Sequence, residues 1–223
     1  MLPSPDTRYA FQKVQPIRAA IFDLDGTLVD SLPATVDAFN VVVSPFLGTR
    51  LTAKEVRIVG VNYRKVLGNF LPPDKVEAGH ERLLAEFISK VADVRPFAGV
   101  PELLANLKSR GCKLAVATLR AEDITQQILE SSGLAGSFER VLCGAEAQGA
   151  GGGFAVDPAA LSRVVSELGI PVENAAFVCD STVDIEAGRK AGMRTAAVAW
   201  GYQRREDLAL SGPDFMFDPL IGA

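Results

Sequence analysis

Short runs of apolar and β-branched residues recur along the chain and predict the strands of a buried sheet. The predicted strands are 18–23, 112–118, 138–144, 175–180 and 194–200, with a shorter one at 214–218. Their apolar positions are nearly continuous, which is typical of parallel strands that are covered on both faces.

Helical patterns lie between the later strands, and each of them stops at a glycine. They cover 100–111, 122–133, 157–169 and 182–192, and the glycines are Gly111, Gly133, Gly169 and Gly192. Glycine at such a place readily takes the left-handed conformation that ends a helix. Strands that alternate with helices of this length predict an α/β fold with a doubly wound parallel sheet.

Residues 32–93 interrupt this alternation. Four helices in succession are predicted there, at 34–46, 52–60, 62–71 and 74–93. The second begins with Thr52 and carries Glu55 three residues later, which is a capping-box pattern. Because no strand separates these helices, we expect an inserted all-helical cap domain and not ordinary layer helices. The predicted organisation is a loose tail at 1–16, an α/β core at 17–31 and 94–223, and a helical cap at 32–93.

Charge and composition exclude several kinds of partner. The chain of 223 residues carries a formal net charge of −4, so it has no electrostatic reason to bind nucleic acid or an anionic membrane. No run of apolar residues approaches the roughly 18 that a membrane helix needs. The first residues lack the apolar centre of a signal peptide. The three cysteines are scattered, which predicts neither a zinc site nor a disulfide framework and favours a reduced, cytoplasmic protein.

The single histidine, His80, limits the possible chemistry. A Ser-His-Asp or Cys-His device would need this residue. It lies inside an amphipathic helical stretch, so we expect it on a helix surface.

Acidic residues follow two of the predicted strands. Asp23 and Asp25 share a side of the chain, because alternate residues of a strand point the same way, and Gly26 permits a sharp turn after them. Asp180 and Asp184 follow a second strand. The carboxyl ends of parallel strands form the binding edge of such a sheet, and Thr118 ends a third strand there.

Four carboxylates at one sheet edge would repel one another. Two unit charges 4 Å apart cost about 4 kcal/mol at an effective dielectric constant of 20. Such a cluster must share protons or hold a cation, and donors that are all oxygen favour magnesium. Taken one at a time, aspartates at strand ends are as often helix caps or turn residues.

Three segments carry a family resemblance. The stretches DLDGTLVDS (23–31) and CDSTVDIEAGRKAGM (179–193), with the apolar run that ends at Thr118, resemble three of the four motifs of the haloacid dehalogenase (HAD) superfamily. The likeness covers roughly residues 17–205 and is strongest to phosphoglycolate-phosphatase-like members with a helical cap.

The resemblance implies a role for each carboxylate. Asp23 would be the nucleophile that forms an aspartyl-phosphate, and Asp25 would protonate the leaving oxygen and later accept a proton from water. Magnesium would be held by Asp23, the backbone carbonyl of Asp25 and Asp180, with Asp184 as a further ligand or as an orienting group. Dehalogenases generally lack an aspartate at the position of Asp25, so its presence favours a phosphatase.

The resemblance also implies residues that bind the substrate. Phosphate-binding candidates are Gly26, Thr118, Leu119 and Arg120. In the cap, Asn62, Arg64 and Lys65 could contact the rest of the substrate, although exposed polar residues at a helix start are an equally good interpretation.

The chain departs from the family pattern at the third motif, where a lysine is expected. Ala155 stands at that position, and no lysine occurs between Lys113 and Lys190. Three hypotheses remain open. Arg120 or another cation supplies the charge, the site is impaired, or the glycine-rich stretch before Ala155 is aligned differently.

The resulting prediction is a cytoplasmic, magnesium-dependent phosphatase for a small phosphorylated metabolite. The cap would close over the site, with hinges near 28–33 and 93–96. The alternative is a catalytically impaired HAD-like binding or regulatory protein. Neither the phosphate ester nor the oligomeric state follows from the sequence.

Overall fold

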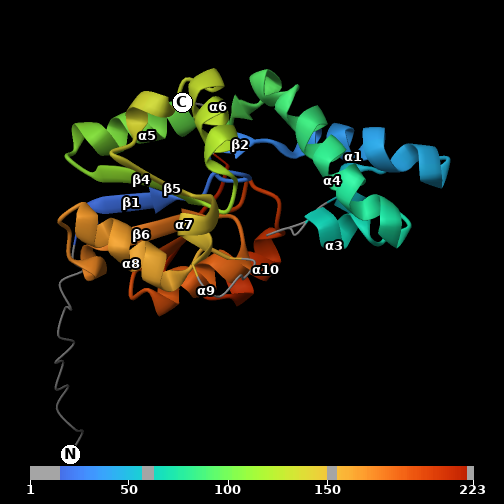
Figure 1. Ribbon diagram of the computed structural model, residues 1–223. Helices are drawn as coiled ribbons and strands as arrows, with labels where there is room; N and C mark the ends of the chain where they lie inside the picture. Colours follow the sequence, from blue (N-terminus) through green and yellow to red (C-terminus); the bar gives the residue numbers. More distant parts are fainter. Residues whose placement is uncertain (1–15, 57–62, 150–154, 220–223) are drawn as a thin grey trace, which may run out of the picture.

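The computed structural model describes residues 16–56, 63–149 and 155–219. Within them, six strands form one parallel sheet in the order β5-β4-β1-β6-β7-β8 (Figure 1). The strands are β1 (Ala19–Phe22), β4 (Lys113–Thr118), β5 (Arg140–Cys143), β6 (Ala175–Cys179), β7 (Arg194–Val198) and β8 (Phe215–Phe217). The predicted fold class is confirmed, and β1 lies at the centre of the sheet.

Alternate residues of β1 serve two different layers. Ala20 and Phe22 pack in one hydrophobic cluster, and Ala19 and Ile21 pack in another. Helices α5 (Val100–Ser109) and α6 (Glu122–Ser131) contribute to the first cluster, while α8 (Pro158–Glu167), α9 (Thr182–Lys190) and α10 (Arg205–Leu210) contribute to the second. Figure 1 shows these helices on opposite faces of the sheet, which explains why all four residues of β1 are buried.

The predicted helix ends are confirmed. The four helices α5, α6, α8 and α9 are followed by Gly111, Gly133, Gly169 and Gly192, whose φ angles are 75°, 74°, 68° and 78°. These values lie in the left-handed region that glycine tolerates without strain.

The chain leaves the sheet through β2 (Val29–Asp30) and returns through β3 (Arg95–Pro96), two short strands that the sequence did not predict. They pair antiparallel, with Val29 opposite Pro96 and Asp30 opposite Arg95. Between them lies the helical segment, which consists of the described residues 32–56 and 63–93. Its described helices are α1 (Leu32–Leu47), α2 (Ala53–Val56), α3 (Tyr63–Leu67), α4 (Val76–Ile88) and the 3₁₀ turns Pro73–Lys75 and Val91–Asp93.

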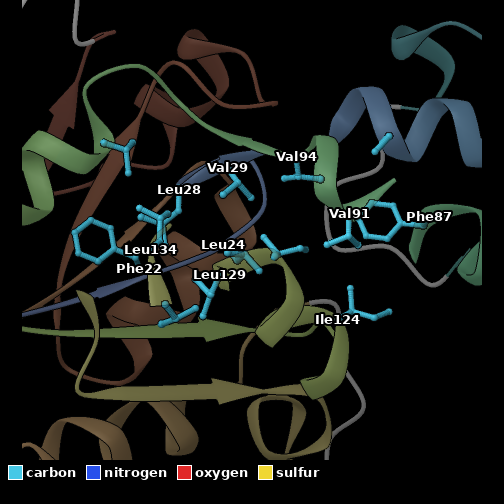
Figure 2. Close-up of a cluster of buried hydrophobic side chains, with 14 of the residues drawn as sticks. Phe22, Leu24, Leu28, Val29, Phe87, Val91, Val94, Ile124, Leu129 and Leu134 are labelled. Carbon is cyan, nitrogen blue, oxygen red and sulfur yellow. The ribbon is translucent and has the colours of Figure 1, made fainter. Parts of the chain in front are cut away.

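The helical segment lies beyond one end of the sheet and packs against it. Figure 1 shows α1, α3 and α4 grouped beside the carboxyl ends of the strands. Phe87 and Val91 of this segment belong to the same cluster as Leu24, which follows β1, and Ile124 of α6 (Figure 2). One continuous apolar core therefore joins the segment to one face of the sheet.

Smaller elements complete the chain. The glycine-rich patch begins with a short helix, α7 (Gly144–Gln148), and 3₁₀ turns occur at Ala135–Ser137 and Val172–Asn174. At the predicted capping box, the Glu55 carboxylate accepts hydrogen bonds from the N–H and hydroxyl of Thr52 at 2.7 and 2.8 Å. In the described ranges, no helix combines the length and the apolar character that crossing a bilayer requires.

Candidate active site

Three adjacent strands bring distant residues to one edge of the sheet. Thr118 is the last residue of β4, and Asp23 and Asp180 directly follow β1 and β6. These three side chains line one cavity of about 430 Å³, together with Asp25 and Asp184. The structure therefore brings together all four carboxylates that the sequence singled out.

Asp23 extends the central strand by one hydrogen bond. Its N–H donates to the carbonyl of Val178 at 2.9 Å, and its carboxylate accepts from the N–H of Leu24 at 2.7 Å. Gly26 then turns the chain with φ of 82°. A Cβ atom at Gly26 would lie 2.7 Å from Cγ of Asp180, closer than real Cβ contacts. The absence of a side chain at Gly26 thus lets the turn after Asp25 approach Asp180 closely.

The beginning of α9 positions the second acidic pair. Ser181 is the N-cap residue: its hydroxyl accepts from the N–H of Asp184 at 3.2 Å and donates to the Asp184 carboxylate. The same carboxylate accepts from the N–H of Val156 at 3.3 Å. Asp180 accepts from the N–H of Tyr202 at 2.6 Å. Main-chain donors and one hydroxyl therefore fix both carboxylates.

Burial raises the pKa of three of the four carboxylates. Burial, and then repulsion from Asp184, Asp180 and Asp25, raise the pKa of Asp23 well above its ordinary value. Burial raises the pKa of Asp180 to about 7 against the opposing hydrogen bond from Tyr202, and burial also raises the pKa of Asp184. A divalent cation would relieve this repulsion, and the oxygen donors suit a hard ion.

The donor set fits a metal ion that is held partly by the main chain. In the part of the chain that the structure describes, no three His, Cys, Asp or Glu side chains form a ready-made metal cluster. The ligand set implied by the resemblance does not require one, since it combines the side chains of Asp23 and Asp180 with the carbonyl of Asp25. Asp184, already engaged by Ser181, suits the orienting role better than that of a ligand.

Arg120 binds Asp25 with two hydrogen bonds. Its Nε and Nη2 donate to the two carboxylate oxygens at 2.8 and 2.7 Å. Burial opposes the charge of Arg120, but Asp25 and Tyr63 outweigh it, so its pKa is raised. The hydroxyl of Ser31 also donates to the Asp25 carboxylate. Asp25 is thus held from two sides.

Tyr202, which sequence reasoning missed, connects the acidic cluster to the start of the helical segment. Besides its N–H bond to Asp180, its hydroxyl accepts from the N–H groups of Ser31 and Leu32 at 2.8 and 3.0 Å. Burial and then Asp25 raise its pKa. The sequence did hold a signal for Tyr202, because this residue follows β7, the neighbour of the strand β6 that Asp180 follows.

The helical segment supplies a second wall of the cavity. Tyr63, Arg64, His80 and Leu84 line it, and Arg64 is bound by Glu77 at 2.7 and 2.8 Å. Lys65 is not among the described lining residues, and Asn62 lies outside the described residues. Of the two predicted cap residues that lie within the described ranges, Arg64 therefore lines the cavity and Lys65 does not.

His80 lies on helix α4 as expected, but the sequence did not predict that it faces the cavity. This residue is partly buried and lines the cavity, and burial, followed by the charge of Arg64, lowers its pKa. The sequence did hold a signal for this position, because His80 and Leu84 are four residues apart on α4 and so share one helix face.

The third motif reaches the site beside Asp184. Val156 lines the cavity, and Ala155 is partly buried against the second apolar cluster. Among the described lining residues there is no lysine. Residues 150–154 lie outside the described ranges.

Comparison with known proteins supports the assignment suggested by the motifs. A family model described as "Haloacid dehalogenase-like hydrolase" matches residues 20–198. The chain belongs to this family. It is 30% identical to a phosphoglycolate phosphatase of Aquifex aeolicus over 88% of this chain and 93% of the relative. It is 32% identical to phosphoglycolate phosphatase 1 of Pseudomonas aeruginosa over 91% and 77%.

A solved structure shares the architecture of this haloacid dehalogenase-like hydrolase. It is described as a predicted phosphoglycolate phosphatase from Haemophilus somnus 129pt. It matches with a TM-score of 0.78 and 26% identity, covering 91% of this chain and 94% of that one. The resemblance inferred from the motifs is therefore confirmed, together with the hydrolase class.

Proposed function

We propose that the protein is a magnesium-dependent phosphatase that hydrolyses a small phosphate monoester through an aspartyl-phosphate. The observation that carries the proposal is the cluster of Asp23, Asp25, Asp180 and Asp184 in one cavity at the carboxyl ends of adjacent parallel strands, with Asp180 and Asp184 buried. The phosphoglycolate phosphatases among the relatives support the same reaction class. A cavity of about 430 Å³ suits a small alcohol portion.

In the first step, a carboxylate oxygen of Asp23 attacks phosphorus. The bond between phosphorus and the ester oxygen breaks, and Asp25 donates a proton to that oxygen as the alcohol leaves. Asp23 must be ionised to attack, whereas burial and repulsion raise its pKa. The mechanism therefore needs a compensating positive charge at this edge.

Asp23, Asp180 and the carbonyl of Asp25 are the groups that would hold Mg²⁺. When bound, the ion supplies charge that offsets the carboxylates and the phosphoryl oxygens. In the second step, Asp25 accepts a proton from the water that attacks the aspartyl-phosphate, and inorganic phosphate is released with Asp23 regenerated.

The remaining predicted roles surround this reaction. Thr118, Leu119 and the turn at Gly26 would bind phosphoryl oxygens. Residues 32–93 would act as the cap that excludes water, with Arg64 and His80 facing the alcohol portion of the substrate.

A second candidate is a protein of this family that binds a phosphorylated ligand and turns it over poorly. It is favoured by Ala155 at the position of the third-motif lysine and by the lack of a lysine among the described lining residues. Losing one such electrostatic contact costs about 10²–10³ in rate.

Turnover of p-nitrophenyl phosphate with and without Mg²⁺ separates the two candidates. We expect activity that EDTA abolishes and excess Mg²⁺ restores, and an Asp23→Asn variant that is at least about 10³-fold slower. An Asp157→Asn variant, altered at the cap of α8, is the matched control and should keep the wild-type rate. Equal, negligible rates for the wild type and Asp23→Asn, with a panel of phosphorylated metabolites also unreactive, would establish the binding protein instead.

A further inference from the structure

Arg120 occupies a buried position where the edge of the sheet meets the helical segment. It follows β4 by two residues, and 9% of its side chain is exposed. Its Nε and Nη2 donate hydrogen bonds to the two carboxylate oxygens of Asp25. Two parallel hydrogen bonds fix the orientation of a carboxylate as well as its position.

The helical segment fixes the other side of the same guanidinium group. The Cζ atom of Arg120 lies 4.3 Å from the centre of the Phe87 ring, and Tyr63, with Asp25, raises the pKa of Arg120. Phe87 belongs to α4 and is 2% exposed within the apolar cluster shown in Figure 2. A buried cation over an aromatic face is attracted by the ring, so α4 restrains Arg120.

This arrangement bears on the role of Arg120 as a phosphate ligand. The edge that would bind a phosphoryl group with two hydrogen bonds is the edge that Asp25 occupies. The geometry directs the guanidinium to the proton-transfer group, and Thr118 accepts only the backbone N–H of Arg120, at 3.3 Å.

We propose that Arg120 is a positioning residue: it aligns the Asp25 carboxyl with the leaving oxygen, and Phe87 holds it in place from α4. This inference rests on the proposed phosphatase function, in which Asp25 has that task. It implies that Arg120 matters most for esters of weakly acidic alcohols, because their leaving oxygen depends on a proton donor, and least for esters of acidic phenols.

The test compares p-nitrophenyl phosphate with benzyl phosphate, two probes of similar size whose leaving groups differ in basicity. We expect Arg120→Lys to lower kcat for benzyl phosphate about 10-fold more than kcat for p-nitrophenyl phosphate, with unchanged inhibition by inorganic phosphate. Phe87→Leu should lower the two rates in the same order by a smaller factor. Arg163→Lys, at an exposed arginine beside Glu146 and Glu167, should change neither rate.

Three results would overturn the proposal. Equal losses on both probes with weaker inhibition by inorganic phosphate would make Arg120 a phosphate ligand. Unchanged rates in Arg120→Lys would show that Asp25 needs no such support. No turnover of either probe by the wild type would instead remove the proposed function itself, and the inference with it. Circular dichroism checks the fold of each variant, and Phe87→Leu decides the question if Arg120→Lys does not fold.

Discussion

At the scale of single residues, Thr27 carries a buried hydroxyl group without a hydrogen-bond partner. Thr27 is 1% exposed, and in the described part of the chain no group hydrogen-bonds its hydroxyl. Its carbonyl, by contrast, accepts from the indole N–H of Trp200 at 3.0 Å. Burying an unpaired hydroxyl has a cost in free energy that burying a methyl group does not.

Replacing Thr27 with valine should therefore stabilise the protein. The two side chains have the same shape, so we expect the free energy of unfolding to rise by about 1 kcal/mol, as measured by urea denaturation. Thr125→Val is the matched control, because the buried hydroxyl of Thr125 donates to the carbonyl of Ala121 at 2.9 Å. The free energy of unfolding of Thr125→Val should fall. A change in the same direction for both variants would show that the unpaired hydroxyl of Thr27 has no such cost.

At the scale of elements, two helices begin with a side-chain cap but differ in what the cap does. Asp157 caps α8 by accepting from the N–H of Ala159 at 2.9 Å. Ser181 caps α9 and also binds the Asp184 carboxylate. The cap at Asp157 was predictable, because Asp followed by Pro marks a helix start. The double role of Ser181 was not, since it depends on where α9 meets the acidic cluster.

The two caps should separate stability from metal binding. Both Ser181→Ala and Asp157→Ala should lower the free energy of unfolding by about 1 kcal/mol. Only Ser181→Ala should also raise the Mg²⁺ concentration needed for half-maximal activity, by about 10-fold, because Asp184 loses the hydroxyl that orients it. Thermal unfolding and a magnesium titration measure the two effects, and an equal magnesium requirement in both variants would argue against an orienting role for Ser181.

At the scale of the whole molecule, the acidic cluster should make stability depend on pH and, through the proposed Mg²⁺ site, on metal. The folded pKa of Asp180 is about 7, against an ordinary value of 3.8. Between these values the folded state holds a proton that the unfolded state has released. The resulting stabilisation is complete below pH 3.8 and is lost as pH rises through about 7; it amounts to about 4 kcal/mol at most.

The metal-free protein should therefore melt at a lower temperature at pH 8 than at pH 5.5. The loss should be smaller in Asp180→Asn, which removes this titrating group. Adding Mg²⁺ at pH 8 should raise the Tm of the wild type more than that of the variant, because the ion binds the ionised carboxylate. Scanning calorimetry of both proteins provides the measurement. An identical pH dependence would mean that Asp180 is not the group responsible.

Much of this fold could be predicted because local patterns determine it. Apolar runs predict the strands that contain Ile21 and Phe177, and glycines predict the ends of the helices. The acidic residues were recognisable because strand ends in a parallel sheet converge. Tyr202 and His80 were not, since their places in the cavity depend on how a loop and α4 pack after the chain has folded.

The pairing of β2 with β3 has an evolutionary consequence. The chain departs at Asp30 and comes back at Arg95, directly across one rung of an antiparallel ladder. An insertion whose two ends are neighbours can be lengthened, shortened or exchanged without shifting the register of any strand in the parallel sheet. The helical segment can consequently change while the carboxylates at the edge of the sheet keep their positions.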